Sequence, residues 1–336
     1  MNVLVNYELF LAKIITLIIM IVSVILLFSA IMKKNKSKKS KLKFTLLQDN
    51  YKNIKNNILL STMKNFEKKI WLKKEKEKNK EKNKEKNKEK ILYVLDFKGD
   101  VYANEVAGLR EEISAILSVA KKNDEVLLRL ESAGGVIHGY GLAASQLNRL
   151  RQKGIKLIVS VDKIAASGGY MMACVADYII SAPFAIIGSI GVVSQIPNFN
   201  KLLKKCHIDI ELHTAGDYKR TLTMFGNNTE STRQKFCEEL NTTHELFKKF
   251  IQEMRPSLNI ESVSNGEHWF GTMALEKNLI DEIRTSDDIL ISKMEDYTLL
   301  HIQYIYTKKI LERFVSSILD NISKIFLKIF FYKNYL

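Results

Sequence analysis

The chain has 336 residues, 46% of them hydrophobic, which is enough to bury the core of one sizeable globular domain with appendages. The formal net charge of +15 suggests a nucleic-acid-binding protein, but much of it lies in two stretches, Lys33 to Lys43 and Lys73 to Lys90. The second stretch alternates lysine with glutamate and asparagine, and it has no aromatic residue or glycine to stack on or wrap a base. We therefore expect a solvated linker there and no nucleic-acid partner.

The first predicted element is an apolar helix. Residues Ile14 to Met32 contain no charge and are nearly all apolar. As a helix they would extend about 28 Å, close to the hydrocarbon core of a bilayer at about 30 Å. A cleaved signal peptide is the alternative, but this run is long for one, and no clear small-residue cleavage site precedes the lysine cluster. The sequence therefore predicts that residues 1–33 form an uncleaved, single-pass membrane anchor, with the lipid bilayer as a partner.

Two features of the sequence bear on which side of the membrane the rest of the chain lies. The lysines that come after the apolar run place the following chain in the cytoplasm by the positive-inside rule. Cys174, Cys206 and Cys237 point weakly the same way, because their odd number and their spacing fit neither a disulfide framework nor a zinc site.

Residues 34–90 form a polar region rich in lysine, glutamate and asparagine. From Ile91 the sequence pattern changes to short apolar runs that alternate with helical patterns. Strand and helix in alternation predict βαβ units around a largely parallel sheet, so we expect an α/β domain over residues 91–290. The predicted strands are 91–95, 126–130, 155–161, 178–181 and 186–193, and the predicted helices are 104–121, 140–152, one that opens near Ser167, and 229–255.

The last part, residues 291–336, carries an amphipathic pattern. Apolar residues recur at three- and four-residue spacing from Ile310 to Phe330, accompanied by lysine and arginine. This predicts a basic amphipathic helix. Packing on its own domain, contact within an oligomer and binding to the membrane surface all remain open for it.

Two strand-to-helix turns carry the candidate chemistry. In Ser132-Ala133-Gly134-Gly135, glycines directly after a strand let the backbone turn sharply and let exposed N–H groups cradle a carbonyl oxygen, although an ordinary turn explains them equally well. Ser167 opens the next turn, and its simplest role is a helix N-cap. Gly168 and Gly169 behind it keep the place free of side chains, and the helix N-terminus favours negative charge there, as an oxyanion site needs.

A base for Ser167 is harder to identify. Lys219 would serve only if burial favoured its neutral amine, and by composition alone an ordinary surface lysine is the simpler interpretation. None of the histidines lies in a motif that marks a base; they are His138, His207, His213, His244, His268 and His301.

Four motifs occur in order along the chain. They are Ser132 to Gly135, Asp162 to Tyr170, Ile187 to Val192 and Gly216 to Arg220. Together they resemble the signal-peptide-peptidase A family of serine proteases, most closely its SohB-type inner-membrane branch. Lys219 follows Ser167 by 52 residues, at family-like spacing. No single motif would be specific, but the resemblance covers about residues 91–290.

The resemblance implies a crotonase- or Clp-like fold of stacked βαβ units and a role for each matching residue. Ser167 would be the nucleophile, Lys219 the general base and Ser189 the hydroxyl that orients the lysine. The N–H groups of Gly135 and Gly168 would form the oxyanion hole, and no metal or organic cofactor is implied. The family often has proline where this chain has Ala133, a departure that removes no catalytic group.

The resemblance also implies partners. Family members with one catalytic domain are ring-like homo-oligomers in which the lysine can come from a neighbouring subunit, and their substrates are unfolded or membrane-derived peptides. Their catalytic domains generally lie outside the cytoplasmic membrane, which conflicts with the lysines after the apolar run. We leave the side of the membrane open.

The expected function is therefore a membrane-anchored serine endopeptidase with a Ser/Lys dyad. Two alternatives use the same features. A crotonase-like acyl-CoA enzyme would hold a thioester enolate with the paired N–H groups, and a non-catalytic membrane scaffold would bind partners or anionic lipid through its lysine-rich regions.

Overall fold

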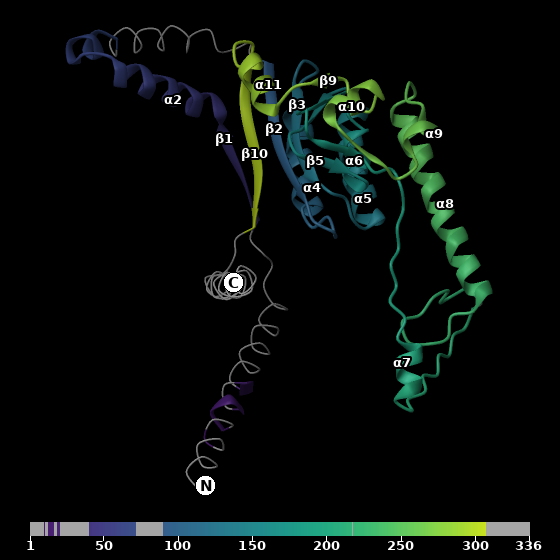
Figure 1. Ribbon diagram of the computed structural model, residues 1–336. Helices are drawn as coiled ribbons and strands as arrows, with labels where there is room; N and C mark the ends of the chain where they lie inside the picture. The colour runs from purple at the N-terminus through teal and green to yellow at the C-terminus, as the bar shows by residue number, and fades with distance from the viewer. Residues whose placement is uncertain are drawn as a thin grey trace, which may run out of the picture. The chain divides into compact units, whose positions relative to one another are not determined.

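A computed structural model of the chain describes residues 10, 13–16, 19–20, 40–71, 90–216 and 218–306 (Figure 1). The chain divides into two compact units, and the larger one, Leu42–Tyr304, contains nearly all of the sheet and its helices. In the other unit, described residues before residue 21 are helical. No helix among the described residues is both long enough and apolar enough to cross a membrane. Most of the predicted anchor and the predicted C-terminal helix lie outside the described residues.

The larger unit is built on one sheet whose strands run in the order β1-β10-β2-β3-β4-β6-β9. From β10 to β9 every neighbouring pair is parallel. A short branch leaves the sheet at β3, where β5 pairs with β3 and β7, and β8 pairs antiparallel with β7. The strands are β1 Ser40–Leu46, β2 Lys90–Gly99, β3 Glu125–Ser132, β4 Lys156–Val161, β5 Ile164–Ala166, β6 Tyr178–Ser181, β7 Ile186–Gly188, β8 His268–Phe270, β9 Glu282–Ile283 and β10 Tyr297–Tyr306.

Helices cover both faces of this sheet, which explains why its central strands are apolar without alternation. Tyr93 and Leu95 of β2 belong to the larger core, with residues of α4, α5 and α6, whereas Leu92 and Val94 belong to a smaller core with residues of α11. Figure 1 shows these helices beside the sheet. The helices are α2 Leu47–Thr62, α4 Val106–Val119, α5 Ile137–Gln152, α6 Gly168–Ala173, α7 Asn200–Lys205, α8 Glu230–Met254, α9 Ile260–Val263, α10 Gly271–Glu276 and α11 Ser286–Lys293.

The mixed α/β architecture with its largely parallel sheet is confirmed. The strand predicted over 186–193 was too long, because β7 ends at Gly188. Gly188 and Ser189 both have positive φ, 102° and 52°, which turns the chain out of the strand. The division of the chain into four parts stays a prediction, and the sheet takes in β1 and β10 on either side of residues 91–290.

A buried carboxyl group joins α4 to β10. Glu112 is 5% exposed, and its Oε1 accepts the backbone N–H of Tyr304 at 2.7 Å. Burial raises the pKa of Glu112 from 4.5 to about 7; the Tyr304 hydrogen bond opposes this shift and the charge of Glu105 adds to it. The folded protein therefore favours the neutral carboxyl, and this contribution to stability is complete below about pH 4.5 and lost as the pH rises through 7.

We predict that Glu112→Gln raises the free energy of unfolding at pH 8 and leaves it nearly unchanged at pH 4. The amide stays neutral at both values, and since one pKa unit corresponds to about 1.4 kcal/mol, the gain is up to about 3 kcal/mol. Denaturant unfolding at the two pH values measures it. Glu111→Gln, exposed on the same helix, is the control and should show no gain that depends on pH. An equal gain at both values would contradict the prediction.

Candidate active site

Ser167 lies in a strained turn between β5 and α6. Its φ of 52° and ψ of −119° fall outside the regions that non-glycine residues favour, and its N–H donates to the carbonyl oxygen of Gly188 at 2.8 Å. Ser167 occupies the N-cap position of α6, as the simpler alternative has it, but its side chain makes no capping hydrogen bond to the helix. The half-buried hydroxyl is therefore left available at a sharp strand-to-helix turn, as in a nucleophile elbow.

The turn at 132–135 packs directly against this serine. Gly134 has φ of 88°, and a Cβ on it would lie 2.8 Å from the carbonyl oxygen of Ala166, the nitrogen of Gly168 and the Cβ of Ser167. No other residue fits there, because any side chain would push the two backbones apart. The sequence singled out both turns, but only the structure shows that Gly134 is the contact between them.

The two predicted oxyanion donors lie on either side of this contact. Gly168 is the first residue of α6, so its N–H has no acceptor within the helix. Gly135 follows Gly134, and a Cβ on it would collide with the backbone of Val101, which holds the turn from its other side. The N–H of Val136 donates to the carbonyl oxygen of Val101 at 2.8 Å and fixes the same segment. Both glycines are therefore held by close backbone packing.

Ser189 stands beside Ser167 at the end of the neighbouring strand. Ala166 pairs with Gly188, so the two serines directly follow paired residues of the parallel strands β5 and β7. Ser189 is half-buried, has φ of 52°, and its N–H donates to the carbonyl oxygen of Glu267 at 2.7 Å. The structure thus brings together Ser167, Ser189, Gly135 and Gly168.

Lys219 does not join this group within the chain. It is exposed, on the long connection between β7 and α8, and its N–H donates to the carbonyl oxygen of Gly216 at 3.2 Å. No hydrogen bond or ion pair among the described residues links its amine to Ser167 or Ser189.

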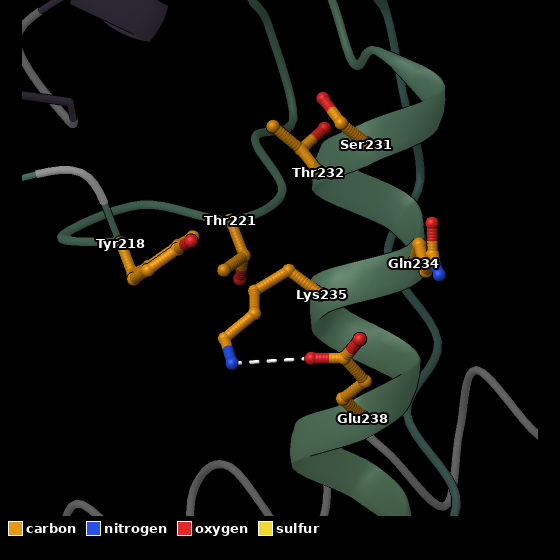
Figure 2. Close-up of a pocket in the computed structure, with 7 residues that line it drawn as sticks. All are labelled: Tyr218, Thr221, Ser231, Thr232, Gln234, Lys235 and Glu238. Carbon is orange, nitrogen blue, oxygen red and sulfur yellow. Dashed lines mark hydrogen bonds and ion pairs between the residues drawn. The ribbon is translucent and has the colours of Figure 1, made fainter.

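The surroundings of Lys219 are polar. Its neighbour Tyr218 borders a pocket of about 390 Å³ on α8, shown in Figure 2. There the Nζ of Lys235 lies 4.9 Å from the centroid of the Tyr218 ring and 3.1 Å from the carboxylate of Glu238. The residues that line this pocket include neither Ser167 nor the two predicted oxyanion donors, so it is distinct from the predicted site.

The histidines give one alternative base. His268 of β8 pairs with Gly188 in the sheet, one strand from Ser167, and it is exposed. His301 instead bonds Asp96 at 3.0 Å, and His213 bonds Glu211 at 3.3 Å. In the ranges that the structure describes, no group of histidine, cysteine, aspartate and glutamate could hold a metal ion.

Two family models match nearly the whole chain, Peptidase family S49 N-terminal over residues 2–147 and Peptidase family S49 over residues 149–300. The chain belongs to peptidase family S49. This S49 chain is 80% identical over 336 residues to the "Probable protease SohB" of Buchnera aphidicola subsp. Acyrthosiphon pisum (strain APS), with 100% of each chain covered. It is 50% identical over 325 residues to the "Probable protease SohB" of Haemophilus influenzae, covering 93% of this chain and 92% of the relative.

Among solved structures, a mutant of the 1510-N membrane-bound stomatin-specific protease in complex with a substrate peptide matches the S49 chain at 15% identity. Its TM-score is 0.41, over 69% of this chain and 99% of that chain. The predicted resemblance to SohB-type peptidases is confirmed by the family models and the close relatives, and the protein is a peptidase by family. The roles of Ser167, Lys219, Ser189, Gly135 and Gly168 stay predictions.

We predict that Gly134→Ala lowers peptidase activity by about 100-fold, because the added methyl group forces the turn away from Ser167 and Gly168. Gly154→Ala is the matched control: Gly154 has φ of 70°, but a Cβ on it would meet nothing within 4 Å. Both variants should lose about 1 kcal/mol of stability from the positive φ, and Gly134→Ala should lose more, because only its methyl group meets neighbouring atoms. Peptide hydrolysis and thermal unfolding are measured together, and equal activity in the two variants would show that the contact is not needed.

Proposed function

We propose that this S49 peptidase is a membrane-anchored serine endopeptidase that cleaves unfolded or membrane-derived peptides with Ser167 as nucleophile and Lys219 as general base. The observation that carries the proposal is the turn at Ser167, whose hydroxyl is not used as a helix cap and is flanked by the glycine turn at 134 and the first N–H of α6. Membership in a peptidase family leaves no observation that favours the acyl-CoA enzyme or the scaffold.

The proposed chemistry follows from these groups. The neutral amine of Lys219 takes the proton of Ser167 as Oγ attacks the peptide carbonyl carbon, and the N–H groups of Gly135 and Gly168 receive the negative oxygen. The amine then gives its proton to the leaving nitrogen, and an ester on Ser167 remains. Water attacks this ester with the same amine as base, which releases the acid and restores Ser167. The hydroxyl of Ser189 orients the amine.

In this proposal Lys219 comes from a second copy of the chain. A lysine acts as a base only where desolvation favours its neutral form, and Lys219 is exposed in the single chain. Most of the described residues in the connection over residues 191–229 are exposed, including apolar side chains that an assembly would bury. These are Val193, Phe199, Leu202, Ile208, Ile210, Leu212, Tyr218, Met224 and Phe225. We therefore propose a ring-like homo-oligomer in which this connection carries Lys219 to the Ser167 of a neighbour.

We predict that Ser167→Ala and Lys219→Ala each lower kcat/KM by about 1000-fold or more, since each removes a partner in the same chemical step. Co-assembly of the two variants should restore about a quarter of the wild-type activity, because a random mixture forms that fraction of sites with both native side chains. Activity is measured on the full chain in detergent.

Two further variants make this test decisive. Lys122→Ala, at an exposed lysine between α4 and β3, should keep full activity. His268→Ala separates the two candidate bases: if it is inactive while Lys219→Ala is active, the base is a histidine. If Ser167→Ala and Lys219→Ala are both inactive and mixing them restores no activity, the Ser/Lys dyad still stands. The proposal that two copies share it would then be refuted.

The proposed anchor is the apolar run from Ile14 to Met32 in the inner membrane. We predict that the wild-type chain stays in the membrane pellet after alkaline carbonate extraction. Val24→Asp combined with Leu26→Asp should move it to the supernatant, because each charge at the centre of a span costs about 3 kcal/mol. Release of the wild type would contradict the anchor. Labelling the exposed thiols of Cys206 and Cys237 with an impermeant maleimide reports the side of the membrane.

A further inference from the structure

A chain of hydrogen bonds lies beneath the glycine turn. The N–H of Gly134 donates to Oγ of Ser132 at 3.1 Å, Ser132 Oγ lies 2.6 Å from the hydroxyl of Tyr140, and that hydroxyl donates to the carbonyl oxygen of Asp100 at 2.8 Å. A tyrosine hydroxyl has one proton, which goes to Asp100, so Ser132 is the donor to Tyr140. In every bond the donor is therefore on the side of the turn and the acceptor on the side of β2, with the side chains of Ser132 and Tyr140 between them.

These side chains are enclosed. Ser132 is 2% exposed and Tyr140 is 0% exposed. Burial raises the pKa of Tyr140, with the hydrogen bond from Ser132 opposing it, so the hydroxyl keeps its proton at any pH suited to a peptidase assay. A Cβ on Gly99 would collide with the hydroxyl groups of both residues, so a glycine is needed where β2 ends beside them. The chain of bonds has little room to rearrange.

The ring of Tyr140 touches the second oxyanion donor as well. A Cβ on Gly168 would collide with three atoms of Tyr140, namely the tyrosine's Cβ and its ring atoms Cγ and Cδ2. The ring therefore lies against the backbone at the start of α6. Phe97 of β2 supports the ring edge-on, with centroids 6.5 Å apart and an interplanar angle of 72°. One side chain thus holds the 132–135 turn through its hydroxyl and Gly168 through its ring.

We propose that Tyr140, acting through Ser132, is a positioning residue that sets the spacing between the N–H groups of Gly135 and Gly168. The inference rests on the proposed function, since it gives those two N–H groups the task of holding the oxyanion. Hydrogen bonds of an oxyanion hole act on the transition state, so loosening their spacing slows the chemical step without weakening the binding of substrate.

The test compares Tyr140→Phe, which keeps the ring against Gly168 and removes the hydroxyl, with the wild-type full chain in detergent. We expect kcat to fall about 10-fold with KM unchanged within about two-fold, less than the loss of about 100-fold or more for a whole donor. Affinity for a peptide boronic acid, which forms a tetrahedral adduct with serine, should fall by the same factor as kcat.

Ser132→Ala is the second variant and removes the other member of the chain of bonds. It should reproduce the loss in kcat, and the double variant should lose about as much as either single one instead of the product of the two, because both act through one path. This comparison also keeps the proposal testable if Tyr140→Phe folds poorly.

Tyr297→Phe is the matched control. Tyr297 is 9% exposed and donates to Glu125 at 2.9 Å, but it pairs with Lys90 at the opposite end of β2 from Gly99. It should lose stability and keep kcat. The proposal is overturned if folded Tyr140→Phe keeps full kcat, if the loss is in KM alone, or if Tyr297→Phe loses as much. Ser167→Ala, run in parallel, separates the two hypotheses, since activity in that variant would refute the proposed function itself.

Discussion

The structure of the site depends on one contact, the packing of Gly134 against the carbonyl oxygen of Ala166, the Cβ of Ser167 and the nitrogen of Gly168. A Cβ on Gly134 would lie 2.8 Å from atoms of the second turn, so the two strand-to-helix turns touch where that Cβ is missing. The available hydroxyl lies on one turn and the proposed oxyanion donors on both. Because two of the three atoms nearest to the missing Cβ belong to the backbone, the contact tolerates no added methyl group.

That contact is possible because neighbouring parallel strands end in line. Gly99 pairs with Ser132, Ser132 with Ala165, and Ala166 with Gly188, so β2, β3, β5 and β7 reach the same edge together. Turns after parallel strands meet at such an edge, where α/β folds commonly bind ligands. Helices on both faces bury the apolar strands, and this leaves the edge as the place where polar groups converge.

The proposed function assigns the remaining group to another copy. The backbone of Ser167 is strained and the residues on either side of it are buried. Lys219 instead lies on an exposed connection with few buried residues. A nucleophile held rigidly and a base supplied by assembly would keep the isolated chain inactive, since its serine has no neutral amine beside it. Such an arrangement would link proteolysis to oligomer formation.

Much of the fold was predictable from local patterns. Alternating apolar runs and helical periods identified the parallel α/β sheet, and the glycines after β3 and β5 marked the turns that carry chemistry. These signals lie within a few residues of chain. The sequence could not show that β5, which follows β4 in the chain, pairs with β3 and β7. Nor could it show that β7 ends at Gly188 or that the Tyr140 side chain contacts both turns. Those features depend on contacts between distant segments, and which segments meet is decided only when the whole core packs, because burial and pairing energies are shared among all the strands and helices.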